Sequence, residues 1–314
     1  MRKAGPDVVM ITGASAGVGR ATAVEFAKRG CSIGLFARGK ERLRSALTDV
    51  ETLGGKGMVL EGDVSNFEDL KSALNDLERE FGPVDIFVNN AMTTIFSEFL
   101  DIDPKDFRRV TEVTYLGVVY GTRVALESMR KRDKGVIVQV GSVLAYRAIP
   151  LQSAYCGAKH AVKGFAESIR CELLYHKSGI HMTMVQLPGL NTPQFDWCKN
   201  NLARKSQPVP PIFQPEVAAS AIVWAAYHRR RELIVGGNSA FIIRANHLFP
   251  RLGDLYLAKT GFSSQMRRER EKHDRPFNLY RPVDGPFGVH GSFDRQAKGM
   301  SFQLRLAMFP FFVW

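Results

Sequence analysis

Cysteine is scarce in this sequence, and the few that occur are not arranged for chemistry. They stand at Cys31, Cys156, Cys171 and Cys198, and no two of them form a C-x-x-C pair. This spacing excludes the common zinc and dithiol motifs. We therefore expect no metal site, and we expect reduced thiols of the kind found in cytoplasmic proteins.

Long apolar runs are also missing. No stretch stays apolar for the roughly 20 residues that a helix needs to cross a bilayer, and the first residues contain no apolar signal core. We therefore expect no transmembrane segment and a cytoplasmic location. With 45% hydrophobic and 24% charged residues, the chain still has the composition of a globular protein with a packed core.

Acidic residues are too few to balance the basic ones, and the net charge is +12. Half of this excess lies in residues 241–314, which contain twelve basic and six acidic side chains. A nucleic-acid or membrane surface is one interpretation of such a surplus. Acids interrupt the basic run at residues 267–272, and nearby aromatics lack the spacing of a base-stacking platform. We favour a solvated helix of mixed charge there and expect no nucleic-acid partner.

Short apolar runs alternate with segments of helical spacing through most of the chain. The expected strands are residues 8–12, 32–37, 58–60, 86–88, 136–140, 182–187 and 233–235. Expected helices cover residues 17–29, 66–81, 104–131, 152–177 and 215–228, with a charged helix that ends near residue 54. This alternation predicts an α/β fold, a doubly wound parallel β-sheet of the Rossmann type with helices on both faces.

The alternation stops near residue 240, which divides the chain into two parts. Residues 1–240 are expected to form the dinucleotide-binding domain with its catalytic site, and residues 241–314 a C-terminal extension. The extension should contain one or two helices at about 244–273 and then irregular chain. Its apolar end, residues 308–314, is short and contains a proline, so packing on the protein or a partner subunit is favoured over insertion in lipid.

A glycine-rich loop joins the first expected strand to the first expected helix. Its sequence, TGASAGVG at residues 12–19, places glycine at 13, 17 and 19. Gly13 allows a sharp turn, Gly17 lets backbone amides approach a pyrophosphate, and Gly19 lets the helix pack closely on the strand. The N-terminus of the helix then favours phosphate. The spacing is G-x-x-x-G-x-G rather than G-x-G-x-x-G, so the strand–helix context carries the prediction of a dinucleotide site.

The residue after the second expected strand indicates which dinucleotide binds. An NAD site places an acid there to bind the ribose hydroxyls, but this chain has Arg38 and no acid at that position. A guanidinium can make two charge-assisted hydrogen bonds to a 2′-phosphate, and Ser15 can donate another. We therefore expect NADP(H) as the cofactor.

Three side chains are suited to reduce a carbonyl or oxidise an alcohol. Tyr155 and Lys159 are four residues apart on an expected helix and so share a face. A free phenol has a pKa near ~10, and a neighbouring ammonium would stabilise its anion and make proton transfer reversible at neutral pH. Ser142 ends an expected strand, at the sheet edge where α/β folds bind ligands, and can bond the substrate oxygen.

These motifs together resemble the short-chain dehydrogenase/reductase family. The resemblance rests on the glycine loop, Asp63-Val64, Asn89-Asn90-Ala91, Ser142, Tyr155-Cys156-Gly157-Ala158-Lys159 and Pro188-Gly189, which follow the family's order over about residues 6–240. It implies that Asp63 and Val64 hold the adenine, that Asn90 and Ala91 lie beside its ribose, and that residues 188–192 cover the nicotinamide. It also implies that Lys159 reaches the ribose of the nicotinamide.

The full set of predicted site residues follows from the motifs and the resemblance. The catalytic residues are Ser142, Tyr155 and Lys159. The cofactor-binding residues are Gly13, Ser15, Gly17, Val18, Gly19, Arg38, Asp63, Val64, Asn90, Ala91, Tyr155, Lys159, Pro188, Gly189 and Thr192.

Two positions depart from the family pattern. Met92 stands where most members have a glycine after Asn-Asn-Ala, and Thr114 stands where the family has an asparagine that holds a water in a proton relay. A threonine hydroxyl can hold a water too, but we expect the helix to be bent less there. Thr114 is therefore left out of the predicted catalytic set.

Two functions fit these residues. The first is an oxidoreductase that transfers a hydride between NADP(H) and a small carbonyl or alcohol substrate; the alternative is a non-catalytic NADP(H)-binding regulatory protein. The intact catalytic set favours the enzyme. Residues 190–215 should form a lid over the pocket, and its side chains Phe195, Trp197, Leu202 and Phe213 favour an apolar substrate.

Two interpretations of the extension remain open at this point. It shapes the rim of the substrate pocket while the cofactor site stays independent of it, or it covers a sheet edge or a subunit contact.

We also predict that the protein is a homodimer or homotetramer. The segments 104–131 and 152–177 resemble the helices that form the family's subunit interface, and Ala161, Phe165 and Ile169 add apolar surface beyond what packing on one sheet requires. Light scattering at micromolar concentration should give a multiple of the 35.0 kDa chain mass. A monomer mass would contradict this expectation.

Overall fold

Seven parallel strands form one sheet at the centre of the molecule. The computed structural model describes residues 7–272, 274–285 and 287–309. The strands are β1 (Val8–Thr12), β2 (Ser32–Ala37), β3 (Lys56–Glu61), β4 (Ile86–Asn89), β6 (Gly135–Ser142), β7 (Ile180–Leu187) and β10 (Glu232–Ile234). They lie in the order β10-β7-β6-β4-β1-β2-β3, and every pairing is parallel. The predicted doubly wound Rossmann fold is confirmed.

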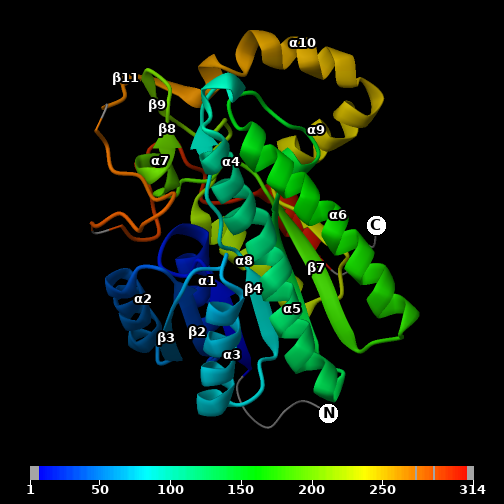
Figure 1. Cartoon of the computed structure of the whole chain (residues 1–314). Helices are drawn as coiled ribbons and strands as arrows, with labels where there is room; N and C mark the ends of the chain where they lie inside the picture. Colours follow the sequence, from blue (N-terminus) through cyan, green and yellow to red (C-terminus); the bar gives the residue numbers. More distant parts are fainter. Residues whose placement is uncertain (1–6, 273, 286, 310–314) are drawn as a thin grey trace.

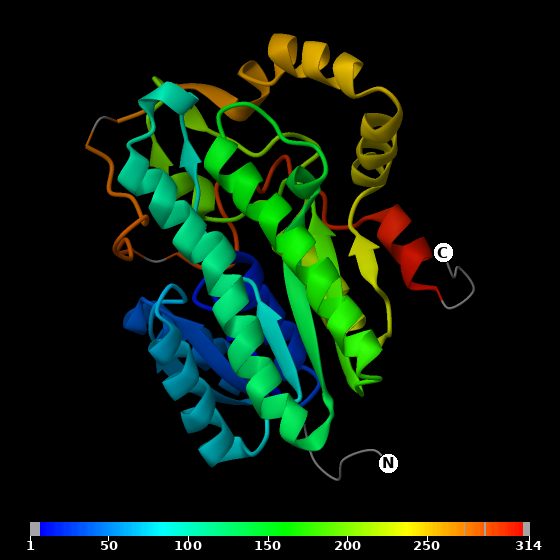
Figure 2. The same ribbon diagram turned by 45° about the vertical axis from the view of Figure 1, so that its right-hand side comes forward.

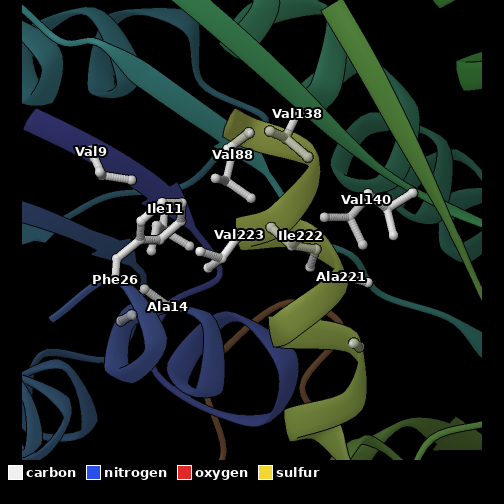
Figure 3. Packing of buried hydrophobic residues seen from close by; sticks show 14 of the residues in the cluster. Val9, Ile11, Ala14, Phe26, Val88, Val138, Val140, Ala221, Ile222 and Val223 are labelled. Atoms are coloured by element: carbon white, nitrogen blue, oxygen red, sulfur yellow. The ribbon is translucent and has the colours of Figure 1, made fainter. Parts of the chain in front are cut away.

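Helices cover both faces of the sheet, which explains why most of the strands are continuous apolar runs. One face carries α1 (Gly17–Ala27), α2 (Lys40–Thr52) and α8 (Pro215–Tyr227). The other carries α3 (Phe67–Phe81), α5 (Gly117–Met129) and α6 (Ser153–Tyr175) (Figure 1). Figure 3 shows the first face from close by, where Ile222 and Val223 of α8 meet Val88 of β4 and Phe26 of α1. Two buried clusters, one on each face, therefore hold the carboxyl ends of the strands in place.

The long helix predicted at residues 104–131 is interrupted. It divides into α4 (Pro104–Thr111), a π-helical turn (Glu112–Leu116) and α5. Pro104 stands at the first turn of α4 and the Asp103 side chain caps it, which explains where the segment begins. The expectation of a less distorted helix at Thr114 is wrong, because the π-turn lies at this residue.

The C-terminal extension has more regular structure than the sequence predicts. It forms α9 (Gly237–Leu248), α10 (Pro250–Thr260), β11 (Met266–Arg270) and α11 (Phe302–Met308). The helix expected through residue 273 is wrong beyond residue 260, because β11 pairs antiparallel with β9 (Arg204–Ser206). Side chains of β11 also make contacts that hold the strand in place. Arg267 lies over the Phe293 ring, and Glu269 forms an ion pair with Lys205. Of the apolar C-terminal segment, residues 310–314 lie outside the described residues.

The lid is built from short elements above the sheet. Residues 190–215 contain α7 (Gln194–Trp197), β8 (Lys199–Asn200) and β9, and β8 pairs with β5 (Ile95–Phe96). Within the described residues no helix is long and apolar enough to span a membrane. The same residues contain no group of three or more His, Cys, Asp or Glu side chains that could hold a metal ion.

Candidate functional site

The glycine loop is packed so tightly against β4 that side chains are excluded from two of its positions. Gly13 has a φ of +67°, and a Cβ there would lie 2.9 Å from the Ala91 Cα. A Cβ on Gly19 would lie 2.2 Å from the carbonyl oxygen of Gly13. Asn90 braces the loop, because its side chain donates to the Thr12 carbonyl at 2.9 Å and its backbone N–H donates to the Thr12 hydroxyl at 2.9 Å.

A cavity of about 870 Å³ opens at the carboxyl ends of the strands, next to this loop. Of the predicted site residues, it is lined by Gly13, Ser15, Gly17, Val18, Arg38, Asp63, Val64, Asn90, Ala91, Tyr155, Lys159, Pro188, Gly189 and Thr192. Gly19 and Ser142 are not on the cavity wall; Gly19 lies behind the loop, and Ser142 is buried between the lining residues Gly141 and Val143. The backbone cradle, the helix N-terminus and the cationic side chain at one end fit a dinucleotide phosphate chain.

Arg38 lies at the end of the cavity next to β2, where the adenosine of a dinucleotide is expected, and the extension holds it there. Its guanidinium donates to the backbone carbonyls of Asn278 at 2.5 Å and Leu279 at 3.2 Å. Asp63 lies 4.0 Å from the same guanidinium. Burial lowers the pKa of Arg38, and the charge of Asp63 acts in the opposite direction. Two backbone carbonyls of the extension and the carboxylate of Asp63 thus hold Arg38 on the cavity wall.

Residues 275–285 and 287–291, which we call the strap, cross the cofactor end of the cavity. Arg42 donates to the carbonyl of Val283, and the backbone N–H of Gly17 donates to that of Gly288 at 3.1 Å. Phe287 packs edge-on against Trp197 of the lid, with ring centroids 4.7 Å apart. In Figure 1 this part of the chain is the orange coil beside α7 and above α2.

The strap corrects one sequence-based expectation. The cofactor-binding residues are not independent of the extension, because Gly17 and Arg38 both hydrogen-bond to the strap. Sequence reasoning missed Asn278 and Leu279, which lie in irregular chain far from every motif. The sequence signal near these two residues is the high content of Pro, Gly and Arg at residues 281–288. That composition predicts a turn and does not indicate a contact with Arg38.

Asp63 is held as an anion by its surroundings. Burial alone would raise the pKa of its carboxyl, but hydrogen bonds from Ser65 and Arg109 outweigh burial and leave the pKa below its usual range. Arg109 also donates to the Leu279 carbonyl at 3.1 Å. Leu279 itself is fully buried, in a cluster with Ile95, Val110 and others. The strap is therefore anchored in the interior at the point where its carbonyls meet the two arginines.

The predicted catalytic side chains lie together at the other end of the cavity. Tyr155 and Lys159 occupy successive turns of α6, and the Lys159 Nζ lies 5.7 Å from the centroid of the Tyr155 ring. Ser142, at the end of β6, accepts a hydrogen bond from the Leu144 N–H at 3.1 Å, and its interaction with Tyr155 acts to lower the pKa of that phenol. Lys159 is buried and donates to the Val140 carbonyl at 2.7 Å.

Burial controls the protonation of this group. It raises the pKa of Tyr155, and the hydrogen bond with Ser142 offsets only part of that effect. It lowers the pKa of Lys159 to about 8. At neutral pH the phenol is therefore neutral and the amine is mostly protonated. Lowering of the Tyr155 pKa by Lys159 is not seen in the protein alone and stays a prediction for the complex with cofactor.

Thr114 does not face the cavity. Its hydroxyl donates to the Thr93 carbonyl at 2.8 Å and accepts from the Thr93 N–H at 3.0 Å, and the residue is fully buried. Both hydrogen bonds tie the π-turn to the chain that follows β4. The hydroxyl is thus engaged with backbone and is not placed to hold a water in the cavity.

The remaining cavity wall is mainly apolar and comes from the lid and the extension. Phe195, Trp197 and Phe213 line it as expected, whereas Leu202 does not. The extension adds residues from α9 and α10, among them Phe241, Ile242, Ala245, Phe249, Leu252, Tyr256 and Leu257. The expectation that the extension shapes the pocket agrees with this wall.

Comparison with known proteins identifies the family of this fold and site. The family model described as short chain dehydrogenase matches residues 7–201. The "Uncharacterized oxidoreductase YxnA" of Bacillus subtilis (strain 168) is 32% identical over 92% of this chain and 81% of that protein. "11-beta-hydroxysteroid dehydrogenase-like 3" of Arabidopsis thaliana is 38% identical over 58% of each chain.

A solved structure supports the same fold. A short chain dehydrogenase/reductase from Burkholderia phymatum in complex with NAD superimposes with a TM-score of 0.73. The match covers 80% of this chain and 96% of that one at 21% identity, which supports the fold alone.

We predict that the strap stabilises cofactor binding. Leu279→Ala removes a fully buried anchor and should loosen the carbonyls that hold Arg38, so the affinity for NADPH should fall by about tenfold or more. Fluorescence titration of NADPH measures this. Met300→Ala, on the exposed part of the extension, is the control and should bind as the parent protein does. Unchanged affinity in a folded Leu279→Ala protein would contradict the prediction.

Proposed function

Because this chain belongs to the short-chain dehydrogenase/reductase family of oxidoreductases, we propose that it transfers a hydride between NADP(H) and an apolar carbonyl or alcohol substrate. One observation supports this most: Tyr155 and Lys159 line the same cavity as the glycine loop and Arg38. A dinucleotide that spans this cavity from Arg38 reaches the side chains that handle the substrate oxygen.

The proposed proton transfer uses Tyr155 as the acid in reduction and as the base in oxidation. When bound, the nicotinamide cofactor supplies or accepts the hydride. In reduction the Tyr155 hydroxyl donates its proton to the carbonyl oxygen while the hydride arrives at the carbonyl carbon, which yields an alcohol and tyrosinate. The raised pKa of Tyr155 keeps the phenol protonated, as this direction requires.

Lys159 and Ser142 support that proton transfer in different ways. The protonated Lys159 amine, 5.7 Å from the Tyr155 ring centroid, stabilises the tyrosinate that remains after the proton has left. Ser142 interacts with Tyr155 and would orient the phenol; to bond the substrate oxygen as proposed, its hydroxyl would have to reach the cavity from behind the wall. The Val140 carbonyl fixes the position of the lysine amine, which by the family resemblance would also bond the ribose of a bound cofactor.

Arg38 supports NADP(H) rather than NAD(H) as the cofactor. It follows the carboxyl end of β2, and among the residues that the structure describes Asp63 is the acid that pairs with its guanidinium. Asp63 is itself paired with Arg109, so the local charge stays positive overall. A 2′-phosphate would find a guanidinium already ordered by the strap, which reduces the entropy cost of binding.

The apolar wall supports a hydrophobic substrate. Leu144, Ile149 and apolar side chains of α9 and α10 make this part of the cavity wall mainly apolar, although Arg147 and Asn246 also line it. A volume of about 870 Å³ for the whole cavity is in the upper range of small-molecule sites and leaves room for a bulky apolar compound beside a dinucleotide. The relative named as a hydroxysteroid dehydrogenase-like protein agrees with this class.

Turnover in Tyr155→Phe distinguishes the enzyme from a non-catalytic regulatory protein that binds NADP(H). The substitution removes one hydroxyl and keeps the ring, so NADPH-dependent reduction of ketones and aldehydes should fall by at least about 10²–10⁴-fold while NADPH affinity stays nearly unchanged. Tyr146→Phe is a matched control, because that hydroxyl bonds Glu232 and does not line the cavity. Equal turnover in both variants would rule out the proposed mechanism.

Arg38→Ala tests the choice of cofactor. Loss of hydrogen bonds to a charged phosphate should weaken NADPH binding by about 10- to 100-fold and leave NADH binding nearly unchanged. Arg44→Ala, an exposed arginine on α2, should alter neither affinity. If both cofactors lost affinity equally, Arg38 would serve only to hold the strap.

A further inference from the structure

The three helices of the extension expose an unusual amount of apolar surface. On α10 and α11 the exposed apolar residues recur at a spacing of three or four residues, so that those of one helix share a face. We call these residues the apolar shelf: Phe241, Ile242, Leu248 and Phe249 at α9, Leu252, Leu255 and Tyr256 on α10, and Phe302, Leu306 and Phe309 at α11. Their side chains are between 41% and 72% exposed, and α10 buries no residue at all.

The shelf forms one region of the molecule. The helix α9 contacts both α10 and α11. In Figure 2, α10 arches over the top of the molecule and α9 and α11 follow down the same side. Single exposed apolar residues are normal on a protein surface, but a contiguous group on neighbouring helices marks a surface that something else covers.

Basic residues accompany the shelf. Arg244, Arg251, Lys259 and Arg305 are exposed on the same three helices. Asp254 is the single acidic residue in the ranges Gly237–Leu248, Pro250–Thr260 and Phe302–Met308, and it pairs with Arg147 of the main domain. An apolar face with a positive border is complementary to a lipid surface that carries anionic headgroups.

The shelf is continuous with the mouth of the cavity. Phe241, Ile242, Phe249, Leu252 and Tyr256 line the cavity and are exposed to solvent. Leu248, Leu255 and the α11 residues extend the apolar surface beyond the cavity wall. A protein partner that covered the shelf would close this mouth, whereas a lipid surface would leave it open to molecules dissolved in the lipid.

We propose that the apolar shelf docks the protein on the surface of an anionic membrane, with the mouth of the cavity facing the lipid. The helices of 7 to 12 residues lie along the interface and do not cross it. Arg244, Arg251, Lys259 and Arg305 bind the headgroups. The docking itself is independent of catalysis; only the idea that apolar substrate enters from the lipid rests on the proposed function.

Vesicle flotation of the full-length protein tests the docking. The parent protein should float with phosphatidylcholine vesicles that contain about a third phosphatidylglycerol, and it should float less with pure phosphatidylcholine or in high salt. Leu248→Asp and Leu255→Asp should each reduce binding by about tenfold or more, because each places a charge on the shelf outside the cavity. Leu174→Asp is the matched control, with a similarly exposed leucine near the end of α6.

The outcomes separate this proposal from its alternatives. Flotation needs neither cofactor nor turnover, so an inactive protein that floats would contradict only the proposed function. A parent protein that does not float with the anionic vesicles would overturn the docking. So would equal loss in Leu174→Asp. A third outcome would assign the shelf to a contact between two copies of the chain. In that outcome the parent protein does not bind vesicles, and light scattering gives Leu255→Asp a lower mass than the parent.

Discussion

The close approach of the glycine loop to β4 is the constraint on which the site depends. Gly19 leaves room for no side chain against the Gly13 carbonyl, and Asn90 and Thr12 join β4 to the end of β1 through hydrogen bonds. Because β1 and β4 are neighbours where the strand order reverses, this junction also opens the crevice between their carboxyl ends. The glycine loop and the cavity that Tyr155 and Lys159 line are thus positioned by one packed contact.

Periodicity and glycine positions were sufficient to predict the sheet and most of its site. All seven predicted strands occur, because buried parallel strands are continuous apolar runs bounded by turns. Tyr155 and Lys159 meet because four residues make about one helical turn, so the spacing alone places them on one face. The strands and the Tyr155–Lys159 pair each depend on residues that are close in sequence, so short sequence patterns are sufficient to predict them.

The strap and β11 could not be predicted in the same way, because tertiary partners determine them. The mixed charges of residues 267–272 are compatible with a helix and with a strand. Part of this segment forms a strand because β11 hydrogen-bonds to β9. The Leu279 carbonyl meets Arg38 and Arg109 across more than 160 residues of sequence, and no spacing rule connects them. The hydrogen bonds of Thr114 to the Thr93 backbone could not be predicted either, because Thr93 belongs to no sequence motif.

The extension contacts two ends of the cavity, with the strap beside Arg38 and the shelf at the mouth near α9 and α10. In the proposed function, a hydride passes within this cavity from NADPH to the carbonyl carbon of an apolar substrate. Incubation with NADPH deuterated at the transferred position, followed by mass spectrometry of the alcohol formed from an apolar ketone, measures this directly. We expect the product to carry the deuterium on its new C–H bond, and we expect the parent protein, but not Tyr155→Phe, to form it. If no deuterated alcohol formed across a panel of apolar ketones and aldehydes while NADPH was bound, this hydride transfer would be ruled out.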